Sequence, residues 1–240
     1  MGTLVPRRAS GRLLGALVVL IFCSVWVIVN GIWLTQHRAG QLMNIDETGY
    51  LGIALNYSYA WERGGFLEWV HALLTPSQHA PVTMAVASIP FLWIHRPMFV
   101  AFAVILAFAA LVLVLTAAYA VLLGNRWVLV TALALVATAP GFISLSRNFT
   151  FAVPATAVTI LALYSLARSR GLLSVPWSVL LGVSVGLMPL TRTMMIAFVP
   201  VVLVAAALHA VGHRERLRRR FVNLVIATAI AATVTGVWLI

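Results

Sequence analysis

Long apolar runs separated by short polar stretches set the pattern of this sequence. A helix needs roughly 20 apolar residues to cross the hydrocarbon layer of a membrane. Seven runs are long enough and predict transmembrane helices at 13–34, 98–123, 127–145, 149–167, 172–190, 193–211 and 221–240. An eighth run, 81–95, would be about 22 Å long as a helix, which is too short to cross comfortably. The expected fold class is therefore all-α, a polytopic bundle of transmembrane helices.

The arginines decide whether the short run 81–95 crosses, because cytoplasmic loops collect basic residues. If it does not cross, eleven of the sixteen arginines lie on the cytoplasmic side, whereas a crossing lowers the count to six. The sequence thus predicts seven spans, a cytoplasmic amino terminus and one long external loop over residues 35–97. The predicted cytoplasmic group is Arg7, Arg8, Arg12, Arg126, Arg168, Arg170, Arg214, Arg216, Arg218, Arg219 and Arg220.

Two short interfacial helices are expected inside the external loop, at about 47–61 and 66–74. The first would start at Asp46, because an aspartate side chain can cap the free amides of a first turn. The second has an apolar face with Trp69 as an interfacial anchor. Residues 75–81, which include two prolines, then break the chain.

Composition supports the membrane interpretation and excludes a soluble domain. Only 9% of the residues are charged and the mean hydropathy is +1.04, whereas about a quarter of the residues of a soluble domain are charged. The net charge of +11 comes from short arginine clusters between apolar runs, so we expect membrane lipids and no nucleic acid as partners. The uncleaved first span and the use of Arg throughout in place of Lys favour a bacterial plasma-membrane protein.

Acidic residues gather in one place. Four of the five, Asp46, Glu47, Glu62 and Glu68, fall within 23 residues of each other in the predicted external loop. The densest point is the stretch Asp46-Glu47-Thr48-Gly49-Tyr50. We therefore expect this stretch to form the functional site of the protein, on the same side of the membrane as the arginines at the outer turns.

The order of these features resembles a known family. One span is followed by the Asp46 to Tyr50 stretch, then by His79-Ala80-Pro81, and then by spans punctuated by Ser146-Arg147 and Leu190-Thr191-Arg192. Over roughly residues 40–211 this resembles the GT-C superfamily of polyprenyl-phosphate-sugar-dependent membrane glycosyltransferases, the group of the protein O-mannosyltransferases and the aminoarabinose transferase of lipid A. The resemblance implies an enzyme that transfers a sugar from a polyprenyl-phosphate donor to a lipid, glycan or protein acceptor of the cell envelope, on the outer face.

The resemblance also implies roles for individual residues. Asp46 would be the catalytic carboxylate, and His79 and Pro81 would line the site. From their positions next to Asp46, and not from the resemblance, Glu47 and Tyr50 are expected to support it. The donor phosphate would be held by arginines of the outer turns, because one guanidinium group can bind two phosphate oxygens at once. These arginines are Arg147, Arg192 and Arg96.

Each assignment has a structural alternative that the sequence leaves open. Asp46 could be only a helix cap, and Glu47 only a favourable charge in the first turn of a helix. The arginines could extend to the lipid headgroups from the ends of their spans. His79 could be a hydrogen-bonded loop residue, and Tyr50 could pack against the spans.

No cofactor is predicted. Two carboxylates and a histidine can in principle bind a divalent metal ion, but the chain offers no further acidic ligand nearby, so no metal site is assigned. The expected organisation is one membrane module over residues 1–240, lacking the carboxy-terminal part of its longer relatives, with the external loop at 35–97. Two other functions remain open: a transporter or flippase of lipid-linked sugars, which would place polar residues in mid-span, or an inactive fragment of a longer enzyme.

Overall fold

The computed structural model of the chain describes residues 7–38, 40, 41, 43–75, 79–124, 126–212 and 215–239, with side chains between residues 15 and 238. Arg214 of the predicted cytoplasmic group lies outside these residues. So do the side chains of Arg7, Arg8 and Arg12 and residues 76–78 of the predicted break. The described residues form helices and no strand, which confirms the all-α fold class.

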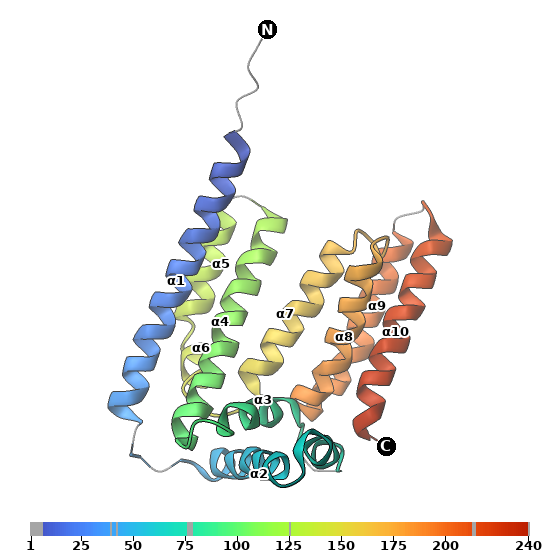
Figure 1. Cartoon of the computed structure of the whole chain (residues 1–240). Coiled ribbons are helices and arrows are strands. Elements are labelled where there is room, and N and C mark those ends of the chain that lie inside the picture. Colours follow the sequence, from blue (N-terminus) through green and yellow to red (C-terminus); the bar gives the residue numbers. More distant parts are fainter. Residues whose placement is uncertain are drawn as a thin grey trace.

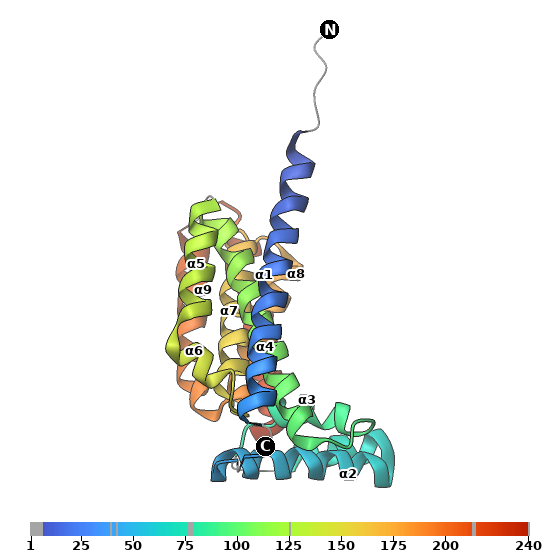
Figure 2. The ribbon, with the colours of Figure 1, turned by 90° about the vertical axis from the view of Figure 1, so that its left-hand side faces the viewer.

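Most helices run lengthwise in one bundle (Figure 1). They are α1 (Arg7–His37), α4 (Pro97–Leu123), α5 (Arg126–Thr138) with α6 (Pro140–Leu145), α7 (Ala152–Arg168), α8 (Val175–Thr191), the 3-10 helix η1 (Thr193–Ala197) with α9 (Phe198–Val211), and α10 (Leu217–Leu239). Two others, α2 (Ile45–Leu74) and α3 (Val82–Phe91), lie across one end of the bundle, as the turned view also shows (Figure 2).

Four of the lengthwise helices are long and apolar enough to cross a membrane, namely 15–37, 97–123, 193–211 and 217–238. This identifies a multi-pass membrane protein. The predicted span 127–145 is broken between α5 and α6, where Pro140 follows Ala139 in an extended conformation (φ −61°, ψ 120°). Proline disfavours helical geometry in the residue before it, which accounts for the break.

The stretch predicted to form the external loop contains the two predicted helices, merged into α2. Gly65 separates them with a left-handed backbone (φ 70°, ψ −159°), so that a helix over 45–64 is followed by another over 66–74. The prediction that Asp46 caps the first of these is wrong. The cap is Asn44, whose side-chain oxygen accepts a hydrogen bond from the amide of Glu47 at 2.8 Å, while the Glu47 carboxylate accepts one from the amide of Asn44 at 3.2 Å. This reciprocal capping box needs an acid three residues after the cap, and Glu47 fills that position.

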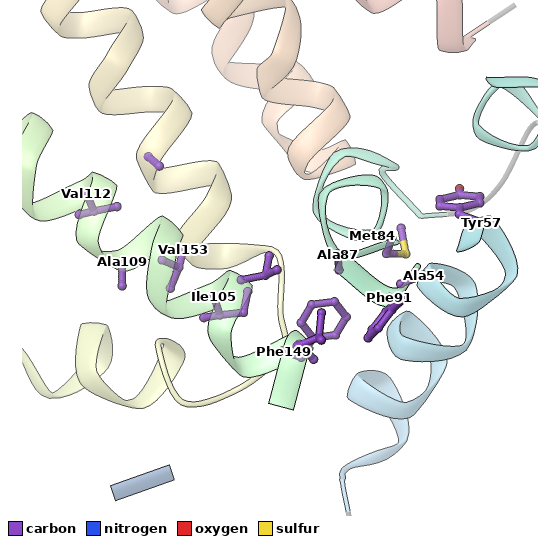
Figure 3. Packing of buried hydrophobic residues seen from close by; sticks show 14 residues of the cluster. Ala54, Tyr57, Met84, Ala87, Phe91, Ile105, Ala109, Val112, Phe149 and Val153 are labelled. Carbon is purple, nitrogen blue, oxygen red and sulfur yellow. The ribbon is translucent and has the colours of Figure 1, made fainter. Parts of the chain in front are cut away.

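A hydrophobic cluster fastens α2 and α3 to the bundle (Figure 3). At its centre lies Phe149, which is fully buried and comes from the turn between α6 and α7. Met84 of α3 and Ile105 of α4 are fully buried in the same cluster, as is Ala54 of α2. Full burial of a Phe, Met or Ile side chain contributes about 1.5–3 kcal/mol to stability. The crosswise helices α2 and α3 therefore form part of the folded core.

Candidate functional site

A cavity of about 380 Å³ opens at the end of the bundle that α2 crosses. Four separate segments form it: the start of α2, residues 79 and 80, the turn before α7, and the turn between α8 and α9. Its lining residues are Asn44, Asp46, Tyr50, His79, Ala80, Leu145, Thr150, Phe151, Ala152, Arg192, Thr193 and Met194. The fold thus brings four of the predicted site residues, Asp46, Tyr50, His79 and Arg192, into one cavity.

Asp46 contributes an exposed carboxylate to this cavity from the first turn of α2. The free amides of a helix start carry partial positive charge and favour an anion there. A carboxylate in such a position is available as a proton acceptor for a bound hydroxyl group. Arg192 faces the same cavity from the junction of α8 and η1, so one anionic and one cationic side chain share the space.

Tyr50 lies one helical turn after Asp46, and its ring packs against aromatic residues of the cavity lining. Its ring lies against Phe151, with centroids 4.2 Å apart, and meets the edge of His79 at 5.3 Å. Burial raises the pKa of Tyr50 above its ordinary value, the Asp46 carboxylate raises it further, and the Arg192 guanidinium lowers it. The tyrosine is therefore a neutral hydroxyl group within electrostatic range of both charges.

Thr150 is a site residue that the sequence did not reveal. Its hydroxyl oxygen is buried and has no hydrogen-bond partner among the described residues, and the residue lines the cavity beside Phe151. A buried hydroxyl without a partner is energetically unfavourable, and a polar group of a ligand in the cavity would satisfy it. The nearby Ser146-Arg147 element could have pointed to this turn, but nothing in the residue type of Thr150 does.

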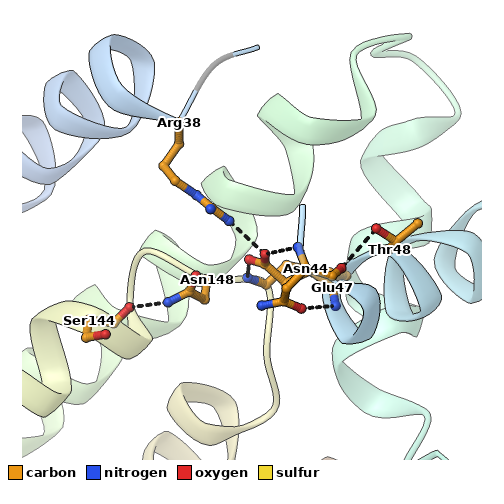
Figure 4. A network of polar contacts seen from close by, with 7 residues as sticks. Arg38, Asn44, Glu47, Thr48, Ser144 and Asn148 are labelled. Atoms are coloured by element: carbon orange, nitrogen blue, oxygen red, sulfur yellow. Dashed lines mark hydrogen bonds and ion pairs between the residues drawn. The ribbon is translucent and has the colours of Figure 1, made fainter. Parts of the chain in front are cut away.

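Glu47 lies outside the cavity and holds three chain segments together (Figure 4). Its side chain is fully buried, and it forms an ion pair with Arg38 at 2.7 Å. Its other carboxylate oxygen accepts a hydrogen bond from the amide of Phe149 at 2.9 Å. Together with the capping contact to Asn44, these bonds join the end of α1, the start of α2 and the turn before α7. The geometry indicates a structural role for Glu47.

Arg147 and Arg96 do not line the cavity of Asp46. The Arg147 Nε donates to the side-chain oxygen of Asn30 at 2.9 Å, and its guanidinium carbon lies 3.9 Å from the centre of the Trp33 ring. Burial lowers the pKa of Arg147, and the residue lines a separate cavity of about 610 Å³. Arg96 lines an apolar groove of about 640 Å³ between α1 and α4. Of the three predicted phosphate-binding arginines, Arg192 alone shares the cavity of Asp46.

Metal ligands do not gather in the part of the chain that the structure describes. A search there for three or more His, Cys, Asp or Glu side chains placed to hold one ion finds none. The polar side chains that line the cavity supply a carboxylate, a guanidinium, an imidazole, an amide and three hydroxyl groups.

Comparison with known proteins identifies a family. A sequence model described as dolichyl-phosphate-mannose-protein mannosyltransferase matches residues 78–238, most of the chain. The matched region contains His79, Thr150 and Arg192 and begins after Asp46. Neither a curated protein nor a solved structure matches significantly.

Proposed function

The chain belongs to the dolichyl-phosphate-mannose-protein mannosyltransferase family, and from this premise we propose that it is a membrane glycosyltransferase that moves a sugar from a polyprenyl-phosphate donor to an acceptor of the cell envelope. Family membership implies a transferase that uses a lipid-linked sugar. The donor lipid, the outer face of the membrane and the residue roles are our proposal.

The observation that carries the proposal is the shared cavity of Asp46 and Arg192. Transfer from a lipid phosphate needs a base for the acceptor hydroxyl and a cation for the leaving phosphate. A cavity with one of each, beside a neutral tyrosine hydroxyl and a buried threonine hydroxyl, meets both needs. The start of α2 adds free amides that favour an anionic phosphate.

The reaction then proceeds as follows. The Asp46 carboxylate accepts the proton of the acceptor hydroxyl as the acceptor oxygen forms a bond to the anomeric carbon of the sugar. The bond between that carbon and the phosphate oxygen breaks, and its electron pair leaves with the polyprenyl phosphate. Arg192 stabilises the charge that develops on this phosphate through charge-assisted hydrogen bonds. Tyr50, Thr150 and His79 orient the two substrates.

The membrane arrangement follows the same proposal. All of the lengthwise segments cross the bilayer as one module of seven spans, and α2 and α3 lie on its outer surface. The alternating direction of the helices supports this: the last residues of α4, α7 and α9 lie at one end of the bundle with the first residues of α5, α8 and α10, while α2 and α3 lie at the other (Figure 1). The amino terminus is then cytoplasmic.

A label-transfer assay tests the proposal. Membranes that contain the full chain are given polyprenyl-phosphate sugars with a labelled sugar, and transfer to envelope acceptors is measured for the wild type, Asp46→Asn and Arg192→Gln. We expect Asp46→Asn to lower transfer by about 10²-fold or more, the contribution typical of a general base. Equal transfer by Asp46→Asn and the wild type would remove Asp46 as the base.

Two matched controls separate these roles from a general effect of charge. Glu62→Gln removes a carboxylate from the same helix, and Arg63→Gln removes a guanidinium; neither residue lines the cavity. Both variants should transfer sugar like the wild type. A loss in these variants equal to that in Asp46→Asn and Arg192→Gln would show that surface charge, and not the cavity, governs transfer.

A further inference from the structure

A second polar cavity, of about 470 Å³, lies at the end of the bundle opposite Asp46. Four arginines line it: Arg168 at the end of α7, Arg170 in the following turn, and Arg216 and Arg219 near the start of α10. No acidic side chain is among its lining residues in the part of the chain that the structure describes. Four like charges around one space repel each other, and a bound anion would relieve that repulsion.

The turn that carries Arg170 is held in a defined conformation. Arg170, Gly171 and Leu172 all have left-handed backbones, with φ of 55°, 67° and 64°. Residues other than glycine adopt this region at a cost and keep it only when the surrounding contacts enforce it. The cavity wall is thus built into the fold.

Two side chains of α10 supply the enforcing contacts. Arg220 is buried and donates to the carbonyl oxygens of Arg170, at 2.9 Å, and of Gly171, while Asn223 donates to that of Leu172 at 2.7 Å. Arg220 also donates to the carbonyl oxygen of Glu215 at 2.8 Å. In the basic run at the start of α10, the buried Arg220 therefore fixes the turn, while Arg216 and Arg219 line the cavity.

Part of the cavity lining is apolar. Leu122 and Trp177 belong to this part, and the Arg168 guanidinium carbon lies 5.1 Å from the centre of the Trp177 ring. An apolar wall beside a group of guanidinium groups suits an amphiphile with an anionic head. Basic pockets between transmembrane helices bind lipid headgroups in this way.

We propose that this cavity is a binding site for a phosphate group, independent of the glycosyl-transfer site at the other end of the bundle. One guanidinium group can bind two phosphate oxygens at once through charge-assisted hydrogen bonds. Phosphate is therefore the anion that the four arginines fit best. The phosphate comes either from an anionic phospholipid of the adjoining leaflet or from a soluble phosphorylated molecule.

Binding to the purified full-length protein tests the site. Dissociation constants are measured in delipidated detergent solution for phosphatidylglycerol, for phosphatidylcholine as the lipid without net charge, and for inorganic phosphate at constant ionic strength. The cavity variant is Arg216→Gln with Arg219→Gln. The matched control is Arg126→Gln with Arg218→Gln, which removes two arginines from the same end of the bundle but none from the cavity.

We expect the cavity variant to weaken binding by at least about tenfold and the control by less than about twofold, since each lost charge-assisted contact is worth roughly a factor of ten. Cavity-dependent binding of phosphatidylglycerol assigns the site to a lipid, and cavity-dependent binding of inorganic phosphate assigns it to a soluble ligand. Equal weakening in both double variants, or no binding of either probe by the wild type, overturns the proposal. The four arginines are exposed, so unchanged unfolding temperatures verify that the variants fold.

Discussion

The carboxylate of Glu47 accepts a hydrogen bond from the backbone amide of Phe149, 102 residues further along the chain. The next residue back, Asp46, is exposed and lines the cavity. Neighbouring residues on a helix point about 100° apart, so the start of α2 turns one acid into the core and the other toward the cavity. Glu47 therefore contributes to the stability of the fold, while the Asp46 carboxylate is accessible from the cavity.

The first prediction separates these two acids. Glu47→Ala leaves the half-buried Arg38 without its partner and the amide of Phe149 without its acceptor. Breaking a buried ion pair costs about 3–5 kcal/mol, which corresponds to a fall in unfolding temperature on the order of 10 °C. Asp46→Asn should unfold at the wild-type temperature. Thermal unfolding of the purified variants in detergent checks this, and greater destabilisation by Asp46→Asn would reverse the two assignments.

The sequence located this pair of acids but placed the helix cap at Asp46, where the structure has Asn44. Both residues sit at a helix start in either interpretation, and the difference lies in the cap. With Asn44 as the cap, Glu47 stands three residues after it, where its carboxylate bonds to the cap amide and points inward. The partners that fix this orientation, Arg38 and Phe149, come from other segments, so no local pattern could show them.

The helices themselves could be predicted because span length depends on local apolarity. Counting arginines left the short run that forms α3 out of the predicted spans, and α3 lies beside α2 across one end of the bundle. The separation of Arg147 from Arg192 could not be predicted, because both follow apolar runs at outer turns. Their cavities differ only through contacts such as the bond from Arg147 to Asn30.

A second prediction distinguishes these two arginines. Arg147→Gln removes the bond to Asn30 and the contact with Trp33, so α1 should pack less tightly and the unfolding temperature should fall by a few degrees. Arg192→Gln should leave the unfolding temperature unchanged. Because the proposed role of its guanidinium in the cavity is to bind the donor phosphate and to stabilise the charge that develops on it, this variant should lower kcat and raise the KM for the donor. Unfolding in detergent and donor-dependent kinetics are measured for both variants. A loss of stability confined to Arg192→Gln would contradict the assignment.

A third prediction concerns the close approach of α8 to α10. A Cβ atom added at Gly182 would lie 2.5 Å from the carbonyl oxygen of Ala227, so Gly182→Ala must push the two helices apart. Overpacking of this kind costs about 1–3 kcal/mol. Gly236→Ala in α10 is the control, because its Cβ would meet nothing within 4 Å and alanine favours a helix by up to about 1 kcal/mol. Unfolding temperatures should therefore move in opposite directions, and a stable Gly182→Ala would refute the packing argument.

A fourth prediction tests the kink in α2. Gly65→Ala meets no steric neighbour within 4 Å, but its φ of 70° is unfavourable for alanine, and we expect a cost of about 1–3 kcal/mol. Gly52→Ala lies in the regular part of the same helix, with open space around its Cβ, and should be neutral or stabilising. Both are compared by thermal unfolding. Stabilisation by Gly65→Ala would mean that the helix can run straight through this position.

The last prediction uses the pKa of Tyr50. Burial is the largest cause of its rise above the ordinary value of 10.0, and the Asp46 carboxylate adds to it. The folded state therefore prefers the neutral hydroxyl, and the stability that depends on this preference is complete below pH 10 and is lost as the pH rises through the folded-state pKa. Tyr50→Phe keeps the ring beside Phe151 and cannot ionise. The difference in unfolding temperature between wild type and Tyr50→Phe should stay constant from pH 7 to about pH 9, and above about pH 10 the wild type should lose stability relative to the variant. Parallel curves across the whole range would show that the Tyr50 hydroxyl does not experience the buried environment described.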